Sequence, residues 1–301
     1  MFLVWPFGEK ELEDTELEDA ILRSDREGVA RTLNRYPAYT DVIQTAFLIA
    51  IAIGNKEIVT MLIHKGADVR ANTEEALSLA AAYGHVDLVR LFVVEYGCDI
   101  HAVEDDPLNM AVLYKHTNVA HLLLIYGANA QANNNAALKR AVDTGNVYLA
   151  TLLLDYDADI HVDDDRLLLT AVLHNFIAMT ELLLTRGSTD HPPPSWQQKK
   201  NESLWHAAYE GHLTIMQVLL DHGADVHAEN DRALYETARQ DEVQAARLLL
   251  SYGATDRDGR ILRKAIRKGS HGVANLLRFV KQSVLPHSLS ILHPSLNRKR
   301  E

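Results

Sequence analysis

Histidine is the residue whose number most strongly suggests a chemical site in this 301-residue sequence, because fifteen are present and imidazole is a common metal ligand. His101, His161 and His227 each follow an Asp by two positions and lie 60 and 66 residues apart. If the chain stacks one helix pair every 30 residues or so, these histidines lie two pairs apart. Packed helices are about 8 to 10 Å apart, so neighbouring members of the set lie roughly 20 Å from each other. A bound ion lies about 2 Å from each ligand. The three histidines therefore cannot share an ion. Only His191, one period of 30 residues after His161, would lie closer to one of them, and we expect no metal site.

Catalytic motifs are missing from the sequence. It contains no G-x-S-x-G, no H-E-x-x-H, no phosphate-binding glycine-rich loop and no paired cysteines. The single cysteine, Cys98, occupies a place where other parts of the chain carry Ala or Ser, which is typical of a packed small side chain rather than a nucleophile. We therefore expect no enzymatic activity and no cofactor.

A recurring Gly-Ala-Asp triplet, with substitutions, organises the elements that carry these residues. It begins at Gly66, Gly97, Gly127, Asp157, Gly187, Gly223 and Gly253, at intervals of 30 or 31 residues apart from one of 36. Two short amphipathic helical patterns precede each triplet, as in residues 203–228 on either side of Gly211. Neither helix exceeds about three turns, so each pair needs a neighbour to bury its apolar face. The fixed period predicts an all-α solenoid.

The residues from Ala207 to Ala228 carry the pattern A-x-x-x-G-H-x-x-x-x-x-x-L-L-x-x-G-A-D-V-H-A, which resembles the ankyrin repeat. The usual T-P-L-H of that family is absent: Glu75-Ala76-Leu77-Ser78 stands there, and the repeat is three residues shorter. The chain looks more like the short-repeat ankyrin proteins of giant DNA viruses and some protists. The resemblance implies a solenoid of about nine stacked helix-turn-helix units with short hairpin loops.

The first and last residues of the repeat pattern divide the chain into three segments. We expect an acidic N-terminal segment over residues 1–16, the solenoid over residues 17–281 and a flexible basic tail over residues 282–301. Residues 188–202, STDHPPPSWQQKKNE, interrupt the period and predict a projecting loop, because three prolines disfavour a helix interior. Trp196 in this loop is interpreted either as a recognition residue or as a side chain packed back onto its neighbours.

Composition narrows the functional classes. The net charge of −11 disfavours binding of nucleic acid by the whole surface, and a single cysteine favours a reducing compartment, the cytoplasm or also the nucleus. The apolar start of the chain is short and is followed by acidic residues, so we expect neither a secretory signal nor a membrane anchor. The prediction is an intracellular monomer.

Ankyrin-like arrays bind partner proteins through the hairpin tips and the exposed edge of the first helices. The resemblance therefore implies a groove lined by the two residues before each turn equivalent to Gly211, where aromatic side chains act as anchors. With Trp196 added from the predicted loop, the expected partner-binding residues are Tyr83, Tyr114, His174, Trp196, Tyr209, Glu210 and Arg239.

Acidic residues cluster just before several first helices and have two interpretations. They could cap the free N–H groups of the following helix, or they could in addition form a negative strip that attracts a basic partner. The residues concerned are Glu104, Asp105, Asp163, Asp164 and Glu229.

Basic residues gather in the last repeat pattern, residues 260–280, and also have several interpretations. They could form a solvated cap, a nuclear-import or anion-binding patch, or a nucleic-acid contact. The predicted patch consists of Arg263, Lys264, Arg267 and Lys268. The sequence favours a non-catalytic protein–protein interaction scaffold of unknown partner, and the alternative is an adaptor that binds an anionic partner or nucleic acid through this patch.

Overall fold

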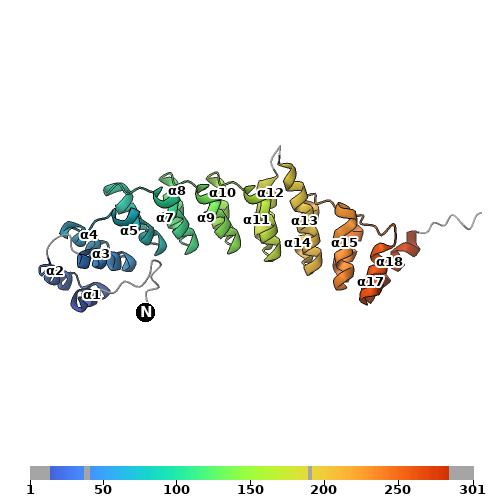
Figure 1. Cartoon of the computed structure of the whole chain (residues 1–301), viewed down its shortest axis with the longest axis horizontal. Coiled ribbons are helices and arrows are strands. Elements are labelled where there is room, and N and C mark those ends of the chain that lie inside the picture. The colour runs from blue at the N-terminus through green and yellow to red at the C-terminus, as the bar shows by residue number, and fades with distance from the viewer. Residues whose placement is uncertain (1–13, 37–40, 189–191, 285–301) are drawn as a thin grey trace, which may run out of the picture. The chain divides into compact units, whose positions relative to one another are not determined.

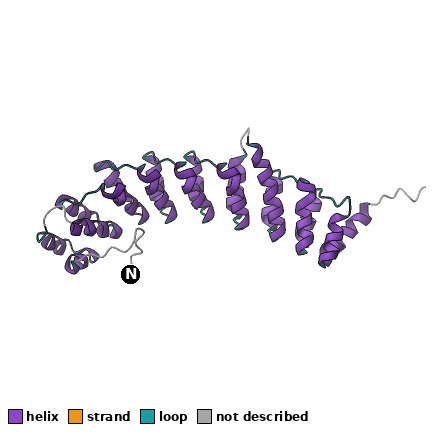
Figure 2. Ribbon diagram, in the orientation of Figure 1, coloured by secondary structure: helices purple, strands orange, loops and turns teal. Residues whose placement is uncertain are grey.

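The computed structural model describes residues 14–36, 41–188 and 192–284. Within these residues the chain forms eighteen α-helices and no β-strand (Figures 1 and 2). Successive helices pair into nine helix–turn–helix repeats, from α1 with α2 to α17 with α18. The predicted all-α class and the number of about nine repeats are confirmed. No described helix is both long and apolar enough to cross a bilayer.

The chain divides into two compact units, residues 1–162 and 163–301, and each is described by itself. The helices of the N-terminal unit are α1 (Thr15–Leu22), α2 (Arg26–Leu33), α3 (Asp41–Ile53), α4 (Lys56–Lys65), α5 (Ala71–Ala82), α6 (Val86–Arg90), α7 (Ala102–Leu113), α8 (Thr117–Ile125), α9 (Ala132–Asp143) and α10 (Val147–Asp155). Those of the C-terminal unit are α11 (Val162–Leu173), which begins at the boundary, α12 (Ile177–Gly187), α13 (Pro194–Glu210), α14 (Leu213–Asp221), α15 (Ala228–Gln240), α16 (Val243–Ser251), α17 (Arg260–Lys268) and α18 (His271–Val284).

Each unit consists of two layers of helices. In the N-terminal unit the odd-numbered helices α1 to α9 pack side by side, as do α6, α8 and α10. In the C-terminal unit α13, α15 and α17 form one layer and α12, α14, α16 and α18 the other. The leucine triplets of the second helices provide the core, because the central members Leu123, Leu153, Leu183 and Leu249 are fully buried. Neighbouring repeats thus bury the apolar face that a single repeat leaves open.

Glycine is required at the inner turns, where one repeat meets the next. Gly54 has φ of 85°, and a Cβ there would lie 2.3 Å from the ring of His85 in the following repeat. His85 reaches back across this glycine, with Nε2 3.0 Å from the carbonyl oxygen of Ala52. Gly84 and His116 repeat the arrangement. The histidine after the turn therefore has a structural role.

The segment between the two turns of the repeat that contains α5 and α6 is one residue longer than the corresponding segment of the repeat that contains α3 and α4. Gly84 and Gly97 are thirteen positions apart, whereas Gly54 and Gly66 are twelve apart. A π-helical turn over Leu91–Glu95 follows α6 and accommodates the extra residue. Val94 in this turn is 63% exposed, so the insertion is directed away from the core.

Residues 194–202, in the second half of the predicted projecting loop, belong to a helix instead. Pro194 begins the seventeen-residue helix α13, in agreement with the preference of proline for a first helical position. Trp196 is 1% exposed, and its ring covers Gly187, where a Cβ would lie 2.5 Å from Trp196 Cζ2. The interpretation in which Trp196 packs back onto its neighbours is the correct one. His191 lies outside the described residues.

Deletion of Val94 should be tolerated, since it restores the twelve-residue spacing and converts the π-helical turn to α-helix. We expect the free energy of unfolding to change by less than about 1 kcal/mol. The control is deletion of His121, which is also exposed but lies within the regular helix α8. That deletion rotates the leucines after it away from the core and should cost about 2–5 kcal/mol. Urea denaturation followed by circular dichroism measures both, and equal losses would contradict the assignment of Val94 as the extra residue.

Candidate functional site

The acidic residues before the first helices adopt a left-handed turn. Val103, Glu104 and Asp105 have φ of 50°, 57° and 59°, and four other repeats have three consecutive residues in the same region. This conformation costs about 1–2 kcal/mol per residue for most L-amino acids, and Asn and Asp tolerate it best. The composition of these turns follows that tolerance: Asn133-Asn134-Asn135, Asp163-Asp164-Asp165 and Glu229-Asn230-Asp231.

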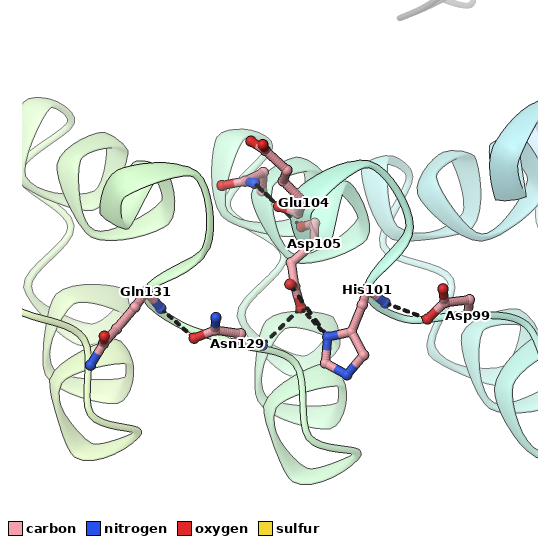
Figure 3. Close-up of polar contacts among 7 residues, drawn as sticks. Asp99, His101, Glu104, Asp105, Asn129 and Gln131 are labelled. Atoms are coloured by element: carbon pink, nitrogen blue, oxygen red, sulfur yellow. Dashed lines mark hydrogen bonds and ion pairs between the residues drawn. The ribbon is translucent and has the colours of Figure 1, made fainter.

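The last residue of the turn binds the next repeat. The carboxylate Oδ1 of Asp105 accepts the backbone N–H of Asn129 at 2.8 Å, 24 positions further on (Figure 3). The same bond, at the same separation of 24 residues, joins Gln44 to Asp68, Asn135 to Asp159, Asn201 to Asp225 and Asp231 to Thr255. We call this series of side-chain-to-backbone bonds the inter-repeat ladder. Asp105 is only 4% exposed, so the bond is shielded from water.

The predicted N-capping role is therefore wrong for Asp105 and Asp231, whose described side-chain bonds go to the next repeat and to a histidine of their own loop. His101 Nδ1 lies 3.1 Å from Asp105 Oδ1, and His227 Nδ1 lies 2.9 Å from Asp231 Oδ1. Asp99 Oδ1 in turn accepts the backbone N–H of His101 at 2.9 Å (Figure 3).

These two histidines thus brace the ladder. In the described ranges no three His, Cys, Asp or Glu side chains converge where an ion could be held. The other predicted acidic residues remain on the surface: Glu104, Asp163, Asp164 and Glu229 are exposed. Glu229 is within 2.5 Å of Arg232 of its own helix, which reduces its availability to a basic partner.

The N-terminal unit carries two of the predicted partner-binding residues at the ends of its first helices. Tyr114, at the end of α7, is 40% exposed. Tyr83, at the end of α5, is half-buried and stacks on His85 with ring centroids 6.2 Å apart. Burial, and then the neighbouring Tyr114, raise the pKa of Tyr83 above its ordinary value. Tyr114 is the more accessible of the two.

The C-terminal unit carries the others. His174 is exposed and stacks on Phe176 at 5.4 Å, and Glu210 at the end of α13 is exposed. Tyr209 is half-buried, and the guanidinium of Arg239 lies 5.5 Å from its ring centroid. Trp196 is not available to a partner, since it is buried at the start of α13.

Two aromatic residues of this face were missed in the sequence. The guanidinium of Arg232 lies 3.8 Å from the Trp205 ring centroid, and Arg260 and Lys264 lie 5.4 and 5.3 Å from the Tyr235 ring. The available signal was spacing: Trp205 precedes Tyr209 by four positions on one helix face, and Tyr235 follows Trp205 by one period of 30.

The predicted basic patch lies on α17 and continues this face. Lys264 is half-buried over Tyr235, while Arg263, Arg267 and Lys268 are exposed. None of these four side chains forms an ion pair with a described carboxylate within 4.0 Å. Their charge is thus uncompensated within the described part of the chain.

Helix pairs that stack in two layers, each on its neighbour, are the arrangement of helical-repeat solenoid proteins. The chain belongs to the ankyrin-repeat family: the family model for "Ankyrin repeats (3 copies)" matches residues 19–104 and 204–284. It is similar to the "Ankyrin repeat and KH domain-containing protein mask-1" of Caenorhabditis elegans, at 27% identity over 242 residues. This match covers 76% of the chain but only 8% of the relative's length. Ankyrin repeats generally mediate protein–protein interactions and are generally non-catalytic.

Replacement of Asp105 by Ala should destabilise the N-terminal unit by about 1–3 kcal/mol, because the shielded N–H of Asn129 loses its acceptor. Glu104→Ala is the matched control, since Glu104 shares the left-handed backbone (φ 57° against 59°) but is exposed. We expect a loss of less than about 1 kcal/mol for the control. Chemical denaturation of both variants measures the difference, and similar losses would mean that backbone strain, rather than the ladder, is responsible.

Stability should fall as the pH falls below about 6.5. Burial lowers the pKa of His116 and of His206 below the ordinary value of 6.5. Between 6.5 and these lower values the unfolded chain binds protons that the folded chain does not, so acid favours unfolding. His116→Asn, which copies Asn146 of the next repeat, combined with His206→Gln should flatten the dependence of melting temperature on pH. An unchanged slope between pH 7.5 and 5.5 would contradict this origin.

Proposed function

We propose that this chain is a non-catalytic interaction module that holds a partner protein against the exposed faces of its first helices. The observation that carries the proposal is the distribution of side chains along those helices. Their middle positions are buried between layers, as for Ala111 and Ala141, whereas aromatic and charged side chains at their ends, such as Tyr114 and Glu210, reach the surface. Exposed aromatic residues on a rigid frame are the kind of group that anchors protein interfaces.

The residues proposed to contact the partner follow from exposure. Tyr114 and His174 provide accessible rings, and Arg239 and Glu210 provide charge. Tyr83 and Tyr209 contribute the part of each ring that remains accessible. The exposed acidic residues Glu104, Asp163, Asp164 and Glu229 form the rim of the surface within their own units.

The proposed setting is a reducing compartment, the cytoplasm or the nucleus, with the chain acting as a monomer. The buried, unpaired Cys98 supports a reducing environment. Burial, together with the neighbouring Glu74, raises the pKa of the Cys98 thiol well above its ordinary value, so the thiol has little nucleophilic character.

A second candidate function is an adaptor that binds an anionic partner through α17. The uncompensated charges of Arg263, Arg267 and Lys268 favour it. The nucleic-acid form of this proposal has less support, because Arg260 and Lys264 lie over the Tyr235 ring on which a base would stack.

Partner capture from a lysate of the source cells tests the proposed surface. We expect the double variant Tyr114→Ala and Tyr209→Ala to lose captured proteins that the unchanged chain retains, since one anchor is removed from each unit. The control is Tyr148→Ala with Tyr252→Ala, which removes one exposed tyrosine from the α10 and α16 side of each unit. Circular dichroism checks that both variants fold. Equal capture by the two variants would contradict a surface on the first helices.

A further inference from the structure

The face formed by α13, α15 and α17 in the C-terminal unit has a regular construction. Aromatic rings of one helix support the cations of the next: Trp205 supports Arg232, Tyr209 supports Arg239, and Tyr235 supports Arg260 and Lys264. We call these the stacked cations. Each ring lies against one side of a charged group, which restricts the position of that cation.

One buried carboxylate orients two of them. Glu236 is 4% exposed, and its Oε2 lies 2.8 Å from Arg239 Nη1 while its Oε1 lies 3.8 Å from Arg232 Nε. Glu236 thus contacts both guanidinium groups. Arg232 also pairs with Glu229 at 2.5 Å, so the positive charge left on this face comes mainly from α17. Each arginine side chain remains about 40% exposed, at 39% and 40%. The guanidinium planes are fixed before any ligand arrives.

Positive charge increases from α13 to α17. Equivalent first-helix positions carry Glu202, Arg232 and Arg260 in one row and Tyr209, Arg239 and Arg267 in another. The nine residues of α17 include five cations and no acid. At 100° per residue these five cations fall within an arc of about 140°, and the apolar residues Ile261, Leu262, Ala265 and Ile266 occupy the other side of the helix.

We propose that this face binds an acidic segment of a partner protein, with carboxylates placed against Arg239, Lys264 and Arg267. The inference rests on the proposed function and specifies the partner's chemistry. A guanidinium group binds a carboxylate through two parallel N–H bonds, and pre-oriented cations lose little conformational entropy on binding. Charge complementarity therefore selects an Asp- or Glu-rich peptide for this surface.

The same residues favour a peptide over nucleic acid. A strand of nucleic acid places a phosphate at every nucleotide and stacks its bases on exposed rings. Here the cations lie over the rings, and Glu210 and Glu229 lie at the surface among them, where they repel a continuous line of phosphates. An acidic peptide matches this alternation of cations and acidic residues, because its carboxylates can be separated by neutral positions.

Fluorescence polarisation with three labelled probes tests the proposal on the full chain. The probes are a twelve-residue peptide of alternating Glu and Ala, the corresponding Lys and Ala peptide, and a twelve-nucleotide oligothymidine. The test variant is Lys264→Glu with Arg267→Glu. The matched control is Arg247→Glu with Arg278→Glu, which changes the net charge equally at exposed positions of α16 and α18.

We expect the Glu and Ala peptide to bind, the Lys and Ala peptide not to bind, and the dissociation constant to rise about tenfold for the test variant but less than about twofold for the control. Absence of binding, or equal weakening by both variants, would overturn the proposal. Tighter binding of oligothymidine through the same two residues would replace the peptide with nucleic acid. If the peptide fails to bind while the Tyr114 and Tyr209 variant still loses its captured partner, the proposed function stands and this inference falls.

Discussion

The hydrogen bond from a backbone N–H to a side-chain oxygen 24 residues earlier is the interaction on which this architecture depends, as between Asn129 and Asp105. A pair of short helices buries too little surface to fold alone, so each repeat must find its neighbour in one register. Apolar packing supplies most of the free energy but is not directional. The ladder provides the direction, because a buried N–H without its acceptor would carry a desolvation penalty of about 1–3 kcal/mol.

This constraint also separates the residues of the ladder from those of the proposed interaction surface. The loop between repeats uses its polar side chains internally: Asp99 binds the backbone of its own turn, and Asp105 binds the next repeat. Asp99 cannot turn toward a partner without breaking its own turn, and Asp105 cannot do so without breaking the ladder. The ends of the first helices do not take part in the ladder, so Tyr114 or Arg239 can be replaced without loss of a ladder bond. The scaffold and the candidate surface therefore use different residues of the same repeat.

The architecture was predictable from the sequence because the residues that form its turns and its core recur with a regular period. Gly-Ala-Asp triplets and leucine triplets recur at fixed intervals, and Leu123 and Leu153 lie where that period places a core. Two features were not predictable for physical reasons. An Asp before a helix has the same local sequence whether it caps that helix or binds a residue 24 positions away, so only the structure reveals the role of Asp105. A break in the period likewise does not distinguish a loop from a longer helix, and Pro194 begins a helix in which Trp196 is buried.

The stacked cations show how a surface charge becomes selective. A free surface arginine samples many rotamers and gains little from a single ion pair. Arg232 and Arg239 are restricted in three ways: by an aromatic ring beneath, by the shared carboxylate of Glu236, and by the helix that bears both of them. The spacing between their charges is consequently a property of the fold. Fixed positions matter in the same way for Arg239, Lys264 and Arg267, against which the partner's carboxylates are proposed to lie: a ligand whose carboxylates match their positions gains more than one with the same net charge at other spacings.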